Sequence, residues 1–317
     1  MAERSEDGEV REVAEGSEDG EVLEVIFLNF RTLNDLNSLI FENLHRIPAD
    51  VDLIVGVPRS GMFAAYLVAS YLHLPVADVD ALEHGDEVFC GKTRVREDWI
   101  HRASEAKKVL LVEDSCHYGR TISALRQRLK GLPCEIIYLA VIVAPEGLGH
   151  PDLWFDLCET PRMFEWNCFQ HRGLAYSAFD IDGVLCRDPT PEENDDGPRY
   201  REFLRTVEPR LHPQYPIGCL ITSRLEKYRP ETEDWLRRGG IAYGKLLMMP
   251  YATAAERRAA GAYGRFKGER YRELAELRFF VESEPWQAEE IARISGKGVF
   301  CPKNHRYYSG ELEGAEK

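Results

Sequence analysis

The sequence contains no run of about 18 apolar residues, which a membrane-spanning helix requires. Its first residues, MAERSEDGEV, are acidic and lack the apolar stretch of a secretory signal peptide, so we expect a cytoplasmic protein with no membrane partner. The eight cysteines include no Cys-x-x-Cys pair. This spacing argues against a zinc site and, without an export signal, favours free thiols.

Positive charge is also scarce. Lysine and arginine number 40 against 54 aspartates and glutamates, and the net charge is −14. Residues 1–24 hold ten acidic residues and two arginines, a charge of −8, which leaves −6 for the rest of the chain. Because nucleic-acid binding needs a basic surface, we expect no nucleic-acid partner. Any phosphate chemistry must then rest on local cations and backbone amides.

The length of 317 residues suits two domains of about 150 residues each. Residues 1–22 repeat the acidic segment SEDGEV and are too polar to form a core, so they are predicted to be a disordered tail. Two series of strands and helices follow, over residues 23–172 and 173–309, with a short tail at 310–317. Strand–helix alternation predicts an α/β fold with two domains, each built on a mainly parallel sheet flanked by helices.

The first series is predicted to contain helices at 32–46, 62–72 and 121–129, and strands at 51–57, 109–113 and 134–143. The second is predicted to contain strands at 178–181, 219–222, 278–281 and 298–300, and helices at 199–207, 230–238, 271–277 and 286–294. Residues 145–172 have no clear period and are expected to cap the first domain before the chain crosses to the second.

The segment VLLVEDSCHYGRT (109–121) ends an apolar strand in Glu113 and Asp114 and continues through a loop with Gly119 into a helix. Such a loop points backbone N–H groups into one concavity at a helix N-terminus, which is a phosphate cradle. Carboxylates beside a phosphate suit a sugar diol or a bridging Mg²⁺. Ser115 and Thr121 add hydroxyls.

This segment resembles the signature of the type I phosphoribosyltransferases. The resemblance implies the fold of that family, phosphoribosyl pyrophosphate as a substrate, and a ribose whose 2- and 3-hydroxyls are held by Glu113 and Asp114. The 5-phosphate would be bound by Ser115, Cys116, His117, Tyr118, Gly119, Arg120 and Thr121. VDLIVGVPRSGMFAA (51–65) resembles the family's pyrophosphate loop, with Arg59, Ser60 and Gly61. Residues 83–105 resemble its lid, with Lys92, Arg94 and Arg96 as the cations that cover the pyrophosphate.

Two departures from the family pattern concern the acceptor. His117 and Tyr118 stand where relatives that use purines or orotate commonly carry Asp and Thr, and Val143 and Ala144 stand where purine enzymes place a lysine. Both changes weaken a purine-salvage assignment. His117 is either a general base on an acceptor hydroxyl or a hydrogen-bond donor to phosphate. Trp166, with Phe164, is expected to pack in the core rather than stack on an acceptor ring.

The segment AFDIDGVLC (178–186) places Asp180 and Asp182 two residues apart after an apolar strand. Side chains at this spacing share one face, so both carboxylates can reach one phosphoryl group. One can attack phosphorus and the other can protonate the leaving oxygen. Two carboxylates facing a phosphate repel it, so the site requires Mg²⁺.

This pattern resembles the first motif of the haloacid dehalogenase-like (HAD) phosphatases, and their other motifs follow in order. The resemblance implies Asp180 as nucleophile, Asp182 as acid/base with its backbone carbonyl on the metal, Thr222 as the hydroxyl of the second motif, Lys267 as the cation and Glu282 as a metal ligand. Ser223 is placed with the substrate-binding residues. Lys245 competes for the role of Lys267, Ser283 replaces the second acid usual after Glu282, and Glu284 is a substitute ligand. The short linker 188–198 implies a HAD-like Rossmannoid fold with a minimal cap.

The two motif sets together predict a bifunctional enzyme. The first site would transfer 5-phosphoribose to an unidentified acceptor, for which a hydroxyl of a sugar or secondary metabolite is favoured, and the second would remove the 5-phosphate from the resulting phosphorylated riboside. One alternative is a nucleobase phosphoribosyltransferase coupled to a nucleotide 5-phosphatase. Another is a ligand-sensing first domain that regulates a phosphatase. A homodimer stays open.

Overall fold

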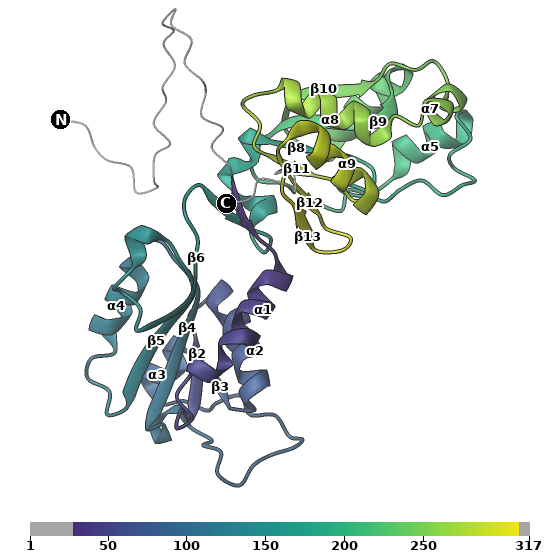
Figure 1. The fold of residues 1–317 in the computed structure, drawn as a ribbon. Coiled ribbons are helices and arrows are strands. Elements are labelled where there is room, and N and C mark those ends of the chain that lie inside the picture. Colours follow the sequence, from purple (N-terminus) through teal and green to yellow (C-terminus); the bar gives the residue numbers. More distant parts are fainter. Residues whose placement is uncertain (1–27, 311–317) are drawn as a thin grey trace, which may run out of the picture.

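A computed structural model describes residues 28–310, so the predicted acidic tail at 1–22 and residues 311–317 of the second tail lie outside the described residues. Within the described residues, two large sheets and one two-stranded sheet organise the chain (Figure 1). We call residues 28–172 the N-terminal half and residues 173–310 the C-terminal half. Within residues 28–310, no helix is both long and apolar enough to span a membrane.

The N-terminal sheet has five parallel strands in the order β3-β2-β4-β5-β6. Helices α1 and α2 pack on one of its faces, and α3 and α4 pack on the other, which makes a three-layer fold. The strands are β2 (Leu53–Gly56), β3 (Val76–Asp78), β4 (Lys108–Cys116), β5 (Glu135–Val143) and β6 (Leu153–Leu157). The helices are α1 (Leu33–Asn43), α2 (Ser60–Leu72), α3 (Val79–His84) and α4 (Arg120–Arg128).

The C-terminal sheet has six strands in the order β10-β9-β8-β11-β12-β13, parallel except for the antiparallel edge strand β13. Helices α5 and α6 cover one face, and α8 and α9 cover the other. The strands are β8 (Ser177–Phe179), β9 (Ile217–Leu225), β10 (Tyr243–Met249), β11 (Phe279–Val281), β12 (Gly298–Cys301) and β13 (Arg306–Tyr308). The helices are α5 (Pro198–Thr206), α6 (Arg229–Arg238), α7 (Ala254–Ala260), α8 (Tyr263–Glu273) and α9 (Pro285–Ser295).

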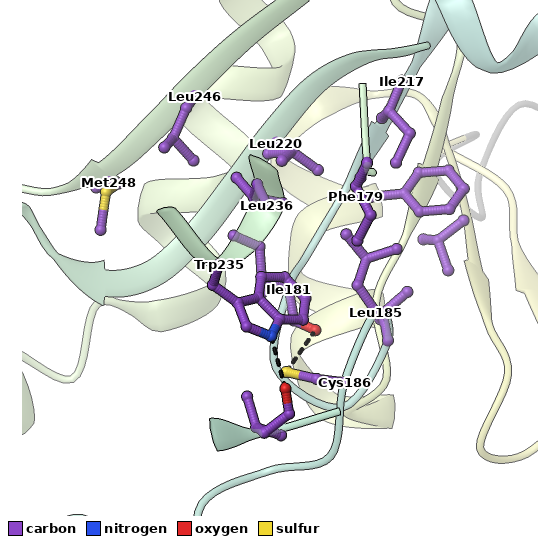
Figure 2. Packing of buried hydrophobic residues seen from close by; sticks show 14 of the residues in the cluster. Phe179, Ile181, Leu185, Cys186, Ile217, Leu220, Trp235, Leu236, Leu246 and Met248 are labelled. Carbon is purple, nitrogen blue, oxygen red and sulfur yellow. Dashed lines mark hydrogen bonds between the residues drawn. The ribbon is translucent and has the colours of Figure 1, made fainter. Parts of the chain in front are cut away.

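The core under α5 and α6 fixes the loop that follows β8 (Figure 2). Trp235 is fully buried there and donates its indole N–H to the carbonyl of Val207 at 2.7 Å. Cys186 lies beside it, with its sulfur 3.8 Å from the carbonyl of Ile181. Because Ile181 and Cys186 are both buried in this core, the chain between them, which carries Asp182, has a fixed position.

A small two-stranded sheet joins the halves. β1 (Asn29–Arg31) pairs in parallel with β7 (Arg162–Phe164), and Phe30 of β1 packs against Phe279, Phe300 and Tyr307 of the C-terminal half at centroid distances of 5.0 to 5.1 Å. Figure 1 shows β1, in purple, between the two larger sheets. The start of the described chain is therefore anchored in the C-terminal half.

The structure confirms the mainly parallel sheet flanked by helices in the N-terminal half. Two local predictions are wrong. Residues 145–172, expected to lack regular structure, contain β6 and β7, and the helix predicted at 271–277 is α8, which begins at Tyr263 and ends at Glu273. Gly264 and Gly268 weaken the helical pattern of α8, but they allow close packing, since a Cβ on Gly268 would lie 2.9 Å from the Cβ of Ile294 in α9.

Candidate substrate sites at the strand ends of the two sheets

Asp114, near the end of β4, is buried and has partners on both carboxylate oxygens. The hydroxyl of Ser60 donates to one oxygen at 2.7 Å, and the indole N–H of Trp166 donates to the other at 2.8 Å. Ser60 begins α2, directly after the loop with Arg59, whose peptide bond to Pro58 is cis. The carboxylate therefore ties together three segments that the sequence separates.

Glu113, the residue before Asp114, is less well satisfied. Its Oε2 atom is buried and has no hydrogen-bond partner. Burial and the neighbouring charge of Asp114 raise its pKa from 4.5 to about 7, although the Thr121 side chain and the charge of Arg162 lower it. An unpaired carboxyl oxygen at this position can accept from, or donate to, a ligand hydroxyl.

The loop after β4 leads into α4 as the sequence predicts. Gly119 caps α4 in the left-handed conformation at φ 70°, and an added Cβ would clash with the ring of His150. The ring of His117 stacks on that of Tyr118 at 3.9 Å. Burial and the charge of Arg162 lower the pKa of His117 and outweigh the charge of Glu146, which raises it, and the Nε2 atom has no hydrogen-bond partner. His117 is therefore neutral near pH 7 and able to take a proton.

The predicted pyrophosphate loop and lid have different surroundings. Arg59 is exposed, and Gly61 packs so closely on β4 that a Cβ would lie 2.8 Å from the carbonyl oxygen of Val112. The lid cations Lys92, Arg94 and Arg96 are exposed, and Arg96 is paired with Asp98 at 2.5 Å. Across the described residues, no hydrogen bond or ion pair joins these three cations to the strand-end residues.

Arg162, on β7, was not singled out from the sequence, because it lies in a segment with no motif. Its Nη1 atom is buried and has no hydrogen-bond partner. The guanidinium lies 5.3 Å from the centre of the Phe164 ring, and that ring stacks on Trp166 at 4.8 Å with an interplanar angle of 3°. The predicted core packing of Phe164 agrees with its burial, whereas Trp166 also holds Asp114.

The second cluster lines a cavity of about 140 Å³ at the carboxyl ends of β8, β9 and β11. Five of its lining side chains are acidic, so the cavity suits a cation or a phosphate that carries one. Its lining residues are Asp180, Asp182, Asp188, Pro189, Asn194, Tyr200, Thr222, Ser223, Arg257, Tyr263, Lys267, Glu282, Ser283, Glu284 and Gln287.

Lys267 of α8 lies between two buried carboxyl groups of this cavity. Its Nζ atom is 2.5 Å from Asp180 Oδ2, 2.5 Å from Glu282 Oε2 and 3.0 Å from Gln287 Oε1. Burial would lower the pKa of Lys267, but the charges of Asp180 and Glu282 outweigh it and raise the pKa. The single ammonium group of Lys267 thus faces two buried carboxyl groups. Burial raises the pKa of one of them, Glu282, to about 7. Lys245, the competing candidate, is exposed and pairs with Glu276.

Asp182 is held by Arg224, a second residue that sequence reasoning missed. The side chain of Arg224 is fully buried, and its Nη2 donates to Asp182 Oδ1 at 2.7 Å while its Nε lies 3.1 Å from Oδ2. This two-point contact fixes the plane of the carboxylate. The arginine follows Thr222 by two residues, and its own backbone N–H donates to the buried Thr222 hydroxyl at 3.2 Å.

The turn after Asp180 requires glycine. Gly183 has φ 80°, and an added Cβ would lie 2.8 Å from the Cβ of Ser283. The Ser283 hydroxyl is 3.4 Å from the main-chain carbonyl of Asp182, so the residue that replaces a second acid packs directly on this turn. Ser223 Oγ is buried without a partner, and its carbonyl accepts from Arg257 at 2.8 Å.

The carboxyl groups of Asp180 and Glu282 line this cavity, and carboxyl oxygens are donors that a hard cation such as Mg²⁺ prefers. Within residues 28–310, however, no three side chains of His, Cys, Asp or Glu form a group that could hold a metal ion. The predicted ligands of a cation here, Asp180, Glu282 and the main-chain carbonyl of Asp182, stay a prediction.

Comparison with known proteins finds a family match in the N-terminal half. The family model of the phosphoribosyl transferase domain matches residues 29–170, which supports a type I phosphoribosyltransferase domain in this part of the chain. The match ends before Asp180. A curated relative, the transcriptional regulator GfcR of Methanococcoides burtonii, is 29% identical over 110 residues, which are 34% of this chain and 52% of the relative. The chain thus spans about half the length of that relative.

Solved structures resemble the chain at low identity. The purine phosphoribosyltransferase of Pyrococcus horikoshii is 20% identical, with a TM-score of 0.34, over 44% of this chain and 94% of that protein. The xanthine-guanine-hypoxanthine phosphoribosyltransferase of Helicobacter pylori is 14% identical, with a TM-score of 0.34, over 44% and 93%. The orotate phosphoribosyltransferase of Aeropyrum pernix is 17% identical, with a TM-score of 0.29, over 39% and 69%.

Proposed function

We propose that the protein is a bifunctional enzyme of two domains, 23–172 and 173–309. The first transfers 5-phosphoribose from phosphoribosyl pyrophosphate to an acceptor hydroxyl. The second, a HAD-like phosphatase, removes the 5-phosphate from the product. Loss of the phosphate makes the overall transfer effectively irreversible and delivers an unphosphorylated ribosyl group.

In the transfer step, the bond between C1 of the ribose and the pyrophosphate oxygen breaks, and a bond from C1 to the acceptor oxygen forms. Glu113 and Asp114 hold the ribose hydroxyls, and the loop from Ser115 to Thr121 holds the 5-phosphate. The neutral ring of His117 takes the proton of the acceptor hydroxyl. Arg59, Ser60 and Gly61, with the lid cations Lys92, Arg94 and Arg96, bind the departing pyrophosphate.

In the hydrolytic step, Asp180 attacks phosphorus and the ester bond to the riboside breaks, which leaves a phosphoaspartate. Asp182 donates a proton to the leaving oxygen. Water then hydrolyses the phosphoaspartate and releases inorganic phosphate, and Asp182 accepts the proton of that water. Lys267 and Thr222 orient the phosphoryl oxygens. A Mg²⁺ held by Asp180, Glu282 and the carbonyl of Asp182 would neutralise the charge between the carboxylates and the phosphate.

The observation that carries the second activity is the contact of Lys267 with Asp180 and Glu282. These residues lie 87 and 15 positions from Lys267 in the sequence, yet all three side chains meet in one cavity with Thr222. The meeting of these residues supports the order of motifs that the sequence shares with the HAD-like phosphatases. The family match of residues 29–170 supports the first activity.

The test uses the full chain, Mg²⁺ and phosphoribosyl pyrophosphate with a labelled ribose, together with a panel of sugar hydroxyl acceptors and nucleobases. The wild type should release pyrophosphate and phosphate and form an unphosphorylated riboside. Asp180→Asn should stop at the 5-phosphorylated product. Glu113→Ala/Asp114→Ala should abolish transfer but keep phosphate release from ribose 5-phosphate. Substantial rates of riboside formation with nucleobases, instead of with hydroxyl acceptors, would favour a nucleobase phosphoribosyltransferase coupled to a nucleotide 5-phosphatase.

A regulatory first domain is the second candidate, and the match to a protein named as a transcriptional regulator favours it. In that case phosphoribosyl pyrophosphate would bind without being consumed and would change the rate of phosphate release. If phosphoribosyl pyrophosphate stays unconsumed after prolonged incubation but changes the rate of phosphate release, the result would support regulation rather than transfer.

A further inference from the structure

Three buried polar atoms without partners belong to one neighbourhood of the N-terminal half. They are Oε2 of Glu113, Nε2 of His117 and Nη1 of Arg162, none of which has a hydrogen bond. Nε2 of His117 lies 4.0 Å from a carboxylate oxygen of Glu146, which is too far for a hydrogen bond. The charge of Arg162 affects both of the other groups, so its guanidinium lies within electrostatic reach of each. A buried polar atom without a partner is costly, and three together indicate a place where a ligand supplies the missing hydrogen bonds.

Arg162 is the member of this group that no motif explains. Burial lowers its pKa, and the surrounding acidic groups and thiols only partly offset that effect. No carboxylate forms an ion pair with it among the residues that the structure describes, and its guanidinium lies 5.3 Å from the centre of the Phe164 ring. The ring is itself stacked on Trp166, so the guanidinium is supported on one side.

We propose that Arg162 binds a carboxylate on the acceptor. This inference rests on the proposed transfer function, in which His117 faces the acceptor hydroxyl. A planar guanidinium offers parallel N–H donors that match the two oxygens of a carboxylate, and the aromatic support limits its freedom before binding. The acceptor class is therefore a hydroxyl compound that also carries a carboxylate, such as a uronic acid.

The 5-phosphate of the donor is the other anion that could reach Arg162. The loop after β4 already provides a site for the 5-phosphate, at the N-terminus of α4 and the left-handed Gly119. Arg162 lies on a separate element, β7, near Trp166. We therefore assign Arg162 to the acceptor, and the experiment separates the two anions.

The test measures the dissociation constants of two matched probe pairs on enzyme that has phosphoribosyl pyrophosphate bound but lacks Mg²⁺, so that no transfer takes place: glucuronate against glucose, and orotate against uracil. Wild type should bind one or both carboxylated probes about tenfold or more tighter than their partners, as expected for a charge-assisted contact. Arg162→Met should bring that ratio near one, and Arg162→Lys should keep part of it. The affinity for phosphoribosyl pyrophosphate should stay within about twofold of wild type. Lys130→Met, which removes an exposed lysine, is the control.

A wild type without carboxylate preference in either pair would overturn the proposal. So would an Arg162→Met variant that loses donor affinity while keeping the preference, since the anion would then be the 5-phosphate. A clear fall in unfolding temperature with the preference intact would show a structural role, because removing an unpaired buried charge should not destabilise the fold. Absence of donor binding by wild type would instead contradict the proposed transfer function.

Discussion

Glu165 and His305 join the two halves of the chain through one carboxylate. The Nδ1 atom of His305, between β12 and β13, lies 2.5 Å from Oε1 of Glu165, and the other oxygen accepts from the backbone N–H of Leu33 at 2.8 Å. Glu165 is 8% exposed, whereas the His305 side chain is half exposed, so the carboxylate is buried and only its partner reaches the solvent. Because Trp166 follows Glu165 and holds Asp114, the carboxylate connects the C-terminal half to the predicted ribose site.

We expect Glu165→Gln to destabilise the protein. The variant keeps the shape of the side chain but loses the negative charge at the N-terminus of α1 and the charge-assisted contact with His305. The expected loss in free energy of unfolding is about 1 to 3 kcal/mol. Urea titration of both proteins measures it, with Glu192→Gln in an exposed loop as the control. Equal stability of the Glu165 variant and wild type would contradict this role.

Trp166→Phe should weaken donor binding more than it slows turnover. Phenylalanine retains the stacking surface against Phe164 but cannot donate to Asp114, which would then be held by Ser60 alone. A hydrogen bond to a charged group contributes about 1.5 to 3 kcal/mol, so the KM for phosphoribosyl pyrophosphate should rise about tenfold or more. The exposed Trp286 supplies the matched control, Trp286→Phe, which should leave the KM unchanged.

The sequence predicts those parts of the sites that lie at strand ends. Glu113 with Asp114, and Asp180 with Asp182, follow apolar runs, and parallel strands bring such positions to one edge of a sheet. The strands at 109–113 and 178–181 correspond to β4 and β8, and the helix at 121–129 corresponds to α4. These elements have strong local patterns, since the strands are buried on both faces.

Contacts between distant segments could not be predicted in the same way. Trp166 reaches Asp114 across 52 residues, and Arg224 reaches Asp182 across 42. Arg162 and Arg224 also could not be predicted as buried residues, because arginine is ordinarily exposed and neither stands in a pattern that indicates a buried charge. The edge strand β10 was missed because its residues alternate between buried and exposed only irregularly. Such features depend on which segments meet in the fold.

Lys267→Met should abolish phosphate release and leave ribosyl transfer intact. Methionine fills the space, but it removes the cation between Asp180 and Glu282, and two buried carboxyls then face each other. Loss of one partner of a buried ion pair costs about 3 to 5 kcal/mol, although uptake of a proton by a carboxyl reduces this cost. Phosphate release from ribose 5-phosphate and urea unfolding measure the two effects.

Lys245→Met is the control for that substitution. Lys245 lies on β10, is exposed and pairs with Glu276, so its loss should change neither phosphate release nor stability measurably. Equal losses of phosphatase activity in the two lysine variants would show that Lys267 is not the specific cation of the cavity.

Gly183→Ala should impair the C-terminal site more than Gly240→Ala. Both glycines have positive φ values, 80° and 66°, so both substitutions carry a backbone cost of about 1 kcal/mol. Only at Gly183 would the new methyl group meet other residues, Ser283 and Asp188, whereas Gly240 has open space around it. The extra displacement of Ser283 and the Asp182 carbonyl should reduce phosphate release and the unfolding midpoint. Identical behaviour of the two variants would contradict the tight turn.

Glu113→Gln should stabilise the protein in a pH-dependent way. The pKa of Glu113 is raised from 4.5 to about 7, because the buried carboxyl favours its neutral form. As pH rises from about 4.5 to 7, the unfolded chain ionises this group while the folded chain retains the proton, so the carboxyl costs the wild type stability over that window. Below the window the two proteins should have equal stability, apart from a constant offset. Above pH 7 the variant should gain up to about 3 kcal/mol relative to that offset.

Urea titrations at several pH values between 4 and 8 measure this difference in stability. The exposed control variant Glu97→Gln should show no pH-dependent gain. A gain that does not change with pH would mean that Glu113 ionises in the folded protein as it does in the unfolded chain, and that the carboxyl at the ribose site is not held neutral by its surroundings.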